Sequence, residues 1–241
     1  MITKNHIKIL KQLQQKKFRN IHKMFIVEGA KSINEFLNSD FNCLNIFHLS
    51  SQTDFNNYAI SLEVSENQLS QITALKQPND CLAIFEMKET TSVINSDLIL
   101  VLDDISDPGN LGTIIRLCDW FGVKNIVCSP NTVDVYNPKV VQATMGSLSR
   151  VNIHYRPLVD FLQHTNLPIY GTFMSGKSIY QQHIKKGCLV MGSEANGISQ
   201  AVEHLINKKI MIPRFGQEQK TESLNVAVAT TIILNEIFRI H

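Results

Sequence analysis

From Leu98 to the C-terminus, short apolar segments alternate with longer segments that repeat apolar residues at helical spacing. This alternation predicts strands joined by helices, and such connections require a mostly parallel sheet covered on both faces. The predicted strands are 98–102, 125–128, 169–174, 188–191 and 209–212. The predicted helices are 111–121, 138–145, 157–164, 199–206 and 224–238.

The first 90 residues contain a second set of elements. Strands are predicted at 25–27, 44–49 and 81–87, and helices at 3–17, 30–37 and 65–72, the last with a Ser65 and Gln68 capping box. The segment 88–97 is polar, lacks periodicity and is typical of a linker. Because 241 residues suffice for two modest domains, we expect an α/β domain over 1–90 and another over 97–241.

Composition narrows the class of protein. A hydrophobic share of 44% and a charged share of 18% are typical of a soluble globular chain. The apolar runs are far shorter than the ~20 residues that span a bilayer, and no secretory signal is visible at the N-terminus. The five cysteines are scattered and never form a CxxC pair, which argues against a disulfide framework and a zinc site. A reducing cytoplasm is the simplest location.

Positive charge is concentrated at the N-terminus, although the net charge of the whole chain is only +2. No acidic residue precedes Glu28, whereas the same segment contains Lys4, Lys8, Lys11, Lys16, Lys17, Arg19 and Lys23. A basic segment without carboxylates suits the neutralisation of nucleic-acid phosphates. The alternative is an ordinary solvated helix face.

Polar residues and glycines gather after three of the predicted strands, where open α/β sheets bind ligands. The first such segment follows strand 98–102 and contains Asn110, and the next helix carries Arg116. Gly112 lies one turn before Arg116, which leaves room for a bulky anion beside the guanidinium. The alternative is a surface pair between Arg116 and Asp119, worth less than about 1 kcal/mol.

The other two segments follow strands 188–191 and 209–212. Gly192 would permit close approach of a ligand to the backbone, although the sequence Asn196-Gly197 also marks a simple turn. Ser223 can cap the last helix, and the amide of Asn225 falls within its first turn. That amide either binds the local backbone or faces a ligand. Neither a P-loop nor a GxGxxG dinucleotide fingerprint is present.

In order and spacing, the three segments resemble the three motifs of the SpoU (TrmH-like) RNA 2′-O-ribose methyltransferases. The matching residues are Asn110, Gly112 and Arg116, then Gly192, Ser193, Glu194 and Gly197, then Ile212, Pro213, Ser223, Leu224 and Asn225. The resemblance extends from about residue 98 to the C-terminus. Segments 17–20 and 25–29 are similar to the small RNA substrate-binding domain that precedes many of these enzymes.

The resemblance implies an α/β catalytic domain with a C-terminal trefoil knot, a feature that is very rare and that pattern reasoning would not propose. It implies a homodimer with the active site near the subunit interface. It also implies that S-adenosyl-L-methionine is bound by Gly192, Ile212 and Leu224, with Thr172 as an addition. No metal is implied, because the methyl donor is already activated.

The resemblance further assigns catalysis to Asn110, Arg116, Glu194, Ser223 and Asn225. A ribose 2′-hydroxyl must lose its proton as it attacks, and free arginine is a poor base because its pKa exceeds ~12. Arg116 is therefore better suited to holding a phosphate, although some accounts of the family give the proton to this arginine, and the sequence leaves both roles open. Asn110 and Asn225 would orient Arg116, the ribose or the donor, and Glu194 would fix Arg116 or a substrate hydroxyl.

These observations lead to one functional hypothesis, an S-adenosylmethionine-dependent methyltransferase that acts on a ribose 2′-hydroxyl of structured rRNA or tRNA. The alternative is a non-catalytic RNA-binding protein that retains the fold, although such a protein should have lost at least one motif residue. An enzyme for a small metabolite is disfavoured by the basic N-terminal segment. The segment 214–221 is longer than in many family members, so its contacts with the donor are expected to differ.

Overall fold

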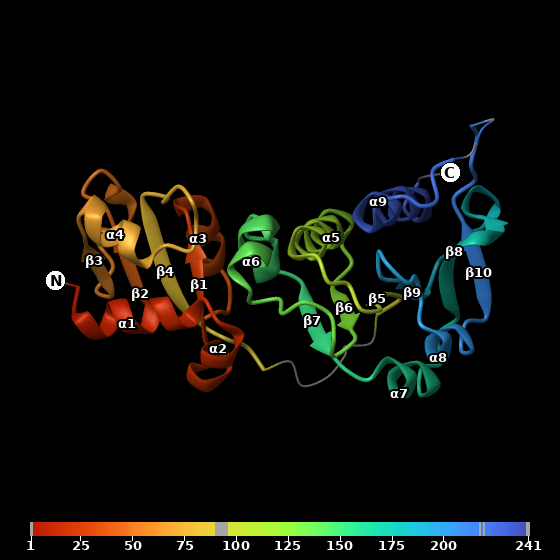
Figure 1. Ribbon diagram of the computed structural model, residues 1–241, viewed down its shortest axis with the longest axis horizontal. Coiled ribbons are helices and arrows are strands. Elements are labelled where there is room, and N and C mark those ends of the chain that lie inside the picture. The colour runs from red at the N-terminus through yellow and green to blue at the C-terminus, as the bar shows by residue number, and fades with distance from the viewer. Residues whose placement is uncertain (1, 90–95, 217, 219, 240–241) are drawn as a thin grey trace. The chain divides into compact units, whose positions relative to one another are not determined.

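The computed structural model describes residues 2–89, 96–216, 218 and 220–239, and the chain divides into two compact units (Figure 1). Unit 1 comprises Met1–Glu89 and Asp134–Arg150, and unit 2 comprises Thr90–Val133 and Val151–His241. The chain therefore passes between the units at three places. The division into domains 1–90 and 97–241 stays a prediction, and most of the expected linker lies outside the described residues.

Unit 1 is built on a four-stranded sheet in the order β1-β4-β2-β3, in which only β2 and β3 are parallel. The strands are β1 (Met24–Glu28), β2 (Cys43–His48), β3 (Ser61–Glu63) and β4 (Cys81–Glu86). The helices are α1 (Lys4–Leu13), α2 (Lys16–His22), α3 (Ala30–Leu37), α4 (Glu66–Ile72) and α6 (Pro138–Thr144), with 3-10 turns η1 (Thr53–Phe55) and η2 (Ser147–Ser149).

Local sequence explains most of these elements, and two predictions need correction. The Ser65 and Gln68 capping box of α4 is confirmed, since each side chain binds the other residue's backbone. The expected helix 3–17 is two helices, because α1 ends at Leu13 and Gln15 adopts an extended backbone before α2. Strand β3 was not predicted, because three residues are too few to show an alternating pattern.

Arg19 is not part of an exposed basic surface. Its side chain is 2% exposed, and Nε and a terminal nitrogen donate to Oδ2 of Asp134 at 3.0 and 2.5 Å. The other terminal nitrogen donates to the carbonyl of Leu13 at 2.9 Å. The expectation that Arg19 helps neutralise phosphates is therefore wrong, because its donors are used inside unit 1. Six lysines of the segment remain exposed: Lys4, Lys8, Lys11, Lys16, Lys17 and Lys23.

Replacing Arg19 by methionine is expected to lower the free energy of unfolding by about 3–5 kcal/mol, because it leaves the Asp134 carboxylate, whose side chain is only 10% exposed, without its partner. Urea denaturation measures this change. Lys16→Met serves as the control, since Lys16 is an exposed cation close by in α2, and it should change stability by no more than ~0.5 kcal/mol. An Arg19 variant as stable as the Lys16 variant would contradict a structural role for the pair.

Unit 2 contains a six-stranded sheet in the order β10-β8-β9-β5-β6-β7, and every neighbouring pair is parallel. The predicted mostly parallel sheet is therefore confirmed. Its strands are β5 (Leu98–Leu102), β6 (Asn125–Cys128), β7 (Asn152–Tyr155), β8 (Ile169–Ser178), β9 (Gly187–Met191) and β10 (Lys208–Met211). Its helices are α5 (Pro108–Phe121), α7 (Leu158–Gln163), α8 (Gln200–Glu203) and α9 (Val226–Ile237), with the 3-10 turn η3 (Ile179–Gln181).

Helices cover both faces of this sheet, as expected for parallel strands. Figure 1 shows α5 and α9 side by side on one face and α7 and α8 together on the other. The α7 and α8 face packs Leu158, Leu162 and Val202 against inward side chains of the strands such as Val101 and Val190. The edge strand β7 was missed, because its sequence Asn-Ile-His-Tyr mixes polar and apolar residues. The trefoil knot stays a prediction.

No helix in the described parts of the chain has both the length and the apolar character that crossing a membrane requires.

Candidate active site

The candidate active site lies in unit 2, at the edge of the sheet where its parallel strands end. Strands β5 and β9 are neighbours, with Leu102 opposite Met191, so the segments that follow them start side by side. The buried Asp103 joins these segments, since its N–H donates to the carbonyl of Met191 at 2.9 Å and its carboxylate accepts from the N–H of Ser199 at 2.7 Å. Asp103 was not singled out from the sequence, because nothing local shows which backbone it binds.

The segment after β9 is a tight turn around Gly192. Ser193 and Gly197 exchange two backbone hydrogen bonds of 2.9 and 3.0 Å, and Gly197 has a φ of +66°. A Cβ atom at position 192 would lie 2.2 Å from the carbonyl carbon of Gly197 and 2.3 Å from the nitrogen of Ile198. The sequence suggested that Gly192 allows a ligand to approach closely. In the structure, the chain's own backbone already takes up the space beside this glycine.

Asn225, not Ser223, caps the last helix. Its Oδ1 accepts from the N–H groups of Ala227 and Val228 at 2.9 and 3.3 Å, and α9 begins at Val226. The expectation that Ser223 caps this helix and that Asn225 lies within its first turn is therefore wrong. The helix starts two residues later than predicted, because the side chain of Asn225 can reach the free N–H groups of the first turn.

The free end of the Asn225 amide connects the three motifs. Its Nδ2 donates to Oδ1 of Asn110 at 2.9 Å, and Nδ2 of Asn110 donates to Oε1 of Glu194 at 2.6 Å. The backbone N–H of Asn110 is held in turn by the carboxylate of Asp107, the cap of α5, at 2.8 Å. One predicted site residue from each motif thus belongs to a single hydrogen-bonded chain, named here the Asn225–Asn110–Glu194 chain.

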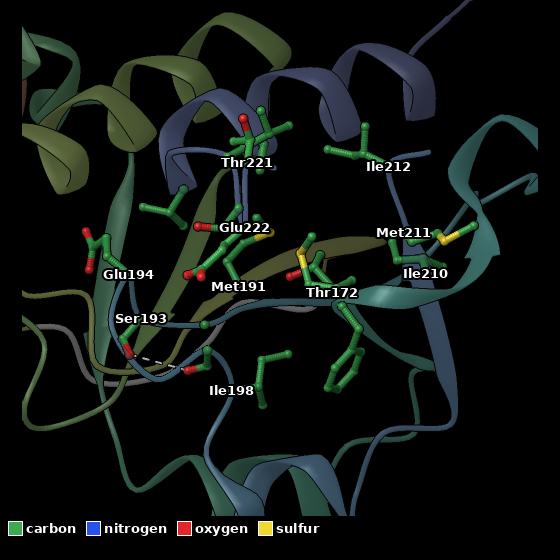
Figure 2. Close-up of a pocket in the computed structure, with 18 of the residues that line it drawn as sticks. Thr172, Met191, Ser193, Glu194, Ile198, Ile210, Met211, Ile212, Thr221 and Glu222 are labelled. Carbon is green, nitrogen blue, oxygen red and sulfur yellow. Dashed lines mark hydrogen bonds between the residues drawn. The ribbon is translucent and has the colours of Figure 1, made fainter. Parts of the chain in front are cut away.

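A cavity of about 720 Å³ opens beside this chain. Figure 2 shows Ser193 and Glu194 on one side of it and Ile210, Met211 and Ile212 on the other. All four residues expected to bind the donor line the cavity, and so do two of the expected catalytic residues: Gly192, Ile212, Leu224 and Thr172, then Glu194 and Ser223. Sequence reasoning missed several apolar wall residues, which carry no local signal: Met174, Met191, Ile198, Ile210 and Met211.

Arg116 lies outside the lining of this cavity. It is exposed on α5, and within the described part of the chain its side chain makes no hydrogen bond or ion pair. The alternative of a surface pair with Asp119 is therefore not observed. The structure also shows Glu194 bound to Asn110 and not to Arg116. The guanidinium is left available to a ligand from outside unit 2.

The segment that precedes α9 borders the cavity and is held by two polar contacts of its own. Arg214 donates to the carbonyl oxygen of Glu222 at 2.8 Å, and Lys220 pairs with Glu218 at 2.7 Å. Arg214, Lys220 and Glu222 all line the cavity. This segment therefore contributes charged groups of both signs to the wall.

The cysteines of unit 2 are unsuited to nucleophilic chemistry. Burial raises the pKa of the Cys118, Cys128 and Cys188 thiols above the ordinary value. A thiol held in its neutral form is a poor nucleophile and a poor metal ligand. Among the described residues, no group of three or more His, Cys, Asp and Glu side chains is arranged to hold a metal ion.

Known proteins are similar to this chain in both sequence and architecture. Residues 97–235 match the SpoU rRNA Methylase family, and residues 4–83 match the MRM3-like substrate binding domain. A Bacillus subtilis relative, the 23S rRNA (guanosine(2553)-2'-O)-methyltransferase RlmP, is 29% identical over 95% of this chain and 94% of its own length.

Two solved structures superpose over nearly the whole chain. A TrmH-family protein from Porphyromonas gingivalis has a TM-score of 0.89 and 33% identity, covering 98% of both chains. An AdoMet-bound rRNA methyltransferase from Sinorhizobium meliloti has a TM-score of 0.86 and 28% identity, covering 98% of this chain and 95% of its own. The family match covers more than half of the chain, and it coincides with the motifs that line and border the cavity. The chain therefore belongs to the SpoU rRNA methylase family.

Proposed function

We propose that this protein transfers a methyl group from S-adenosylmethionine to a ribose 2′-hydroxyl of ribosomal RNA. The observation that carries the proposal is the Asn225–Asn110–Glu194 chain, which brings three distant motifs together at the wall of one cavity. Relatives named as 23S rRNA 2′-O-methyltransferases support ribosomal RNA as the substrate class. Such a substrate is consistent with a cytoplasmic location.

The cavity suits the methyl donor. Its volume lies in the range of small-molecule sites, and Met191, Ile198 and Leu224 give it an apolar wall. S-adenosylmethionine supplies a methyl group on a positively charged sulfur, so the methyl carbon is open to attack without a metal. Gly192, Ile212, Leu224 and Thr172 would hold this donor.

The remaining residues would act on the RNA. Arg116 would hold the phosphate beside the target ribose, because its exposed guanidinium has five donors and no partner among the described residues. Asn110 and Asn225 would keep Glu194 in a fixed position, and Ser223 would contact the donor or the ribose from the cavity wall. A non-catalytic RNA-binding role is disfavoured, because the expected site residues are all present and three are bonded together.

Incubating the protein with methyl-labelled S-adenosylmethionine and separated 23S, 16S and transfer RNAs tests the proposal. We expect label in ribosomal RNA, at a single nucleotide whose 3′ phosphodiester bond resists alkaline cleavage because the 2′-oxygen carries the methyl group. Calorimetry should detect donor binding to the protein alone. A folded protein that neither binds the donor nor labels any RNA would be the non-catalytic RNA-binding protein. Label in transfer RNA alone would support the methyl-transfer reaction but would overturn ribosomal RNA as the substrate.

We also infer a homodimer that forms through the outer face of α5 and α9. Large apolar side chains are exposed on or next to these helices: Trp120 of α5 is 85% exposed, Val228 of α9 is 48% exposed, and Phe238, the residue after α9, is 44% exposed. Large apolar side chains left exposed on two packed helices are characteristic of protein interfaces. A second copy is the partner that the family resemblance implies.

Trp120 is the chain's single tryptophan, and it allows a direct test of this face. Trp120→Glu should convert the dimer to a monomer in sedimentation equilibrium, and dilution of the wild type should shift its tryptophan emission to longer wavelength. Ile21→Glu is the control, because Ile21 is 60% exposed on α2 in unit 1 and should leave the mass unchanged. A Trp120 variant that remains dimeric would show that the dimer does not form through this face.

The exposed lysines of α1 are expected to contribute to RNA binding. Lys4, Lys8 and Lys11 lie three or four residues apart and so share one side of the helix. Changing all three to glutamine should weaken RNA binding and reduce the slope of log K against log salt by about one unit per lost phosphate contact. The triple arginine variant keeps the charge and should keep the slope. An unchanged slope in the glutamine variant would show that this side of α1 is an ordinary solvated face that does not contact RNA.

A further inference from the structure

The hydrogen bonds of the Asn225–Asn110–Glu194 chain can run in only one direction. The N–H groups of α9 can only donate, so Oδ1 of Asn225 must be their acceptor and its NH2 group must face Asn110. Oδ1 of Asn110 accepts from this NH2 group, which turns the NH2 group of Asn110 towards Glu194. The end of α9 thereby fixes both amides, and Glu194 receives a hydrogen bond on Oε1.

The second oxygen of Glu194 is open. The residue is exposed at the cavity wall, and Oε2 accepts no hydrogen bond from the residues that the structure describes. Figure 2 places Glu194 on the opposite side of the cavity from Ile210, Met211 and Ile212. One oxygen is thus held in position, and the other is free to meet a hydroxyl group that arrives at the edge of the cavity.

The other candidates for a proton acceptor are less suitable. An arginine side chain such as that of Arg116 has five N–H donors and no acceptor atom. Two further carboxylates line the cavity, and Glu203 is already paired with Lys209 at 2.6 Å. Glu222 belongs to the segment before α9, and none of the hydrogen bonds of the Asn225–Asn110–Glu194 chain reaches it. Glu194 alone among these carboxylates is oriented by residues of the other two motifs.

We propose that Glu194 is the catalytic residue that accepts the proton of the target ribose 2′-hydroxyl, an inference that rests on the proposed function. The O2′–H bond breaks and its proton passes to Oε2 of Glu194, while the electron pair left on O2′ forms the bond to the methyl carbon. The carbon–sulfur bond breaks at the same time, and its electron pair remains on the sulfur, which becomes neutral. Water then takes the proton from Glu194 and restores the carboxylate.

Glu194→Gln isolates this role, because the glutamine oxygen can still accept from Asn110 but the side chain can no longer take up a proton. We expect the rate constant for methyl transfer under single-turnover conditions to fall by about 10²–10⁴-fold. The dissociation constant for S-adenosylmethionine, measured by calorimetry, should stay unchanged. Glu222→Gln is the competing variant, and loss of transfer there with full transfer in Glu194→Gln would overturn the proposal.

Chemical rescue separates a proton acceptor from a structural carboxylate. Glu194→Ala leaves a gap beside Asn110, and added formate should restore part of the transfer rate in proportion to its concentration. The same formate should not rescue Arg116→Ala, whose missing group is a cation. A folded Glu194→Ala protein that binds the donor and is never rescued, or a fully active Glu194→Gln protein, would overturn the assignment. If the wild type itself transferred no methyl group, the proposed function would fail instead.

Discussion

Replacing Arg116 by alanine is expected to reduce methyl transfer at least ~10²–10³-fold, the size of loss seen when one group that stabilises transition-state charge is removed. The guanidinium is exposed on α5 and makes no hydrogen bond or ion pair with the described residues, so its removal should cost the fold little. The dissociation constant for S-adenosylmethionine should remain nearly unchanged, because Arg116 does not line the cavity. Single-turnover kinetics with saturating RNA and calorimetry with the donor measure the two quantities separately.

Two further variants sharpen this expectation. Arg116→Lys keeps the positive charge but loses the planar fork that binds a phosphate through two hydrogen bonds, so it should recover only part of the rate. Lys124→Ala removes another exposed cation of unit 2 and should keep the wild-type rate. Loss of donor binding in Arg116→Ala would show that Arg116 belongs to the donor site and would refute its assignment to the RNA.

Gly192→Ala is the second change with a large expected effect. The added Cβ would lie 2.2 Å from a backbone carbon and 2.3 Å from a backbone nitrogen of the facing turn, and backbone atoms cannot move aside as a flexible side chain can. Overpacking of this kind costs about 1–3 kcal/mol, so donor affinity should fall by roughly 10- to 100-fold as the turn shifts. Calorimetric titration with S-adenosylmethionine measures the loss.

Gly216→Ala is the matched control for the glycine variant. Gly216 also borders the cavity, yet a Cβ there would meet no atom within 4 Å. Its donor affinity should therefore stay close to that of the wild type. If Gly192→Ala bound the donor as tightly as Gly216→Ala, the turn around position 192 would not shape the donor site.

Local patterns in the sequence predicted the secondary structure of unit 2 well. Strands β5 and β6 were predicted with their observed bounds, because short apolar runs, 98–102 and 126–128, mark strands buried on both faces. The N-terminal ends of helices were less certain, since α5 begins at Pro108 and α9 at Val226. Each of these helix starts depends on which side chain accepts hydrogen bonds from the first free N–H groups. The spacing of apolar residues does not identify that capping residue.

The family was also predictable, because the order and spacing of the three motifs are properties of the sequence alone. The family match and the similar structures confirm the predicted membership and the predicted methylase class. The individual catalytic roles stay predictions. Their tests are the Arg116 and Glu194 variants, because similarity shows which positions correspond and not what each side chain does.

The sequence by itself determined the parallel sheet, the three polar segments at its edge and the family. Only the tertiary structure decided that Arg19 is buried against Asp134, 115 residues away, and not exposed to phosphates. It also decided that Asn225 caps α9 while its amide meets Asn110, again 115 residues away, and that Asn110 meets Glu194 across 84 residues. Apolar periodicity and turn residues act over a few positions, whereas the partner of a buried or bridging polar group is set by the packing of the whole fold.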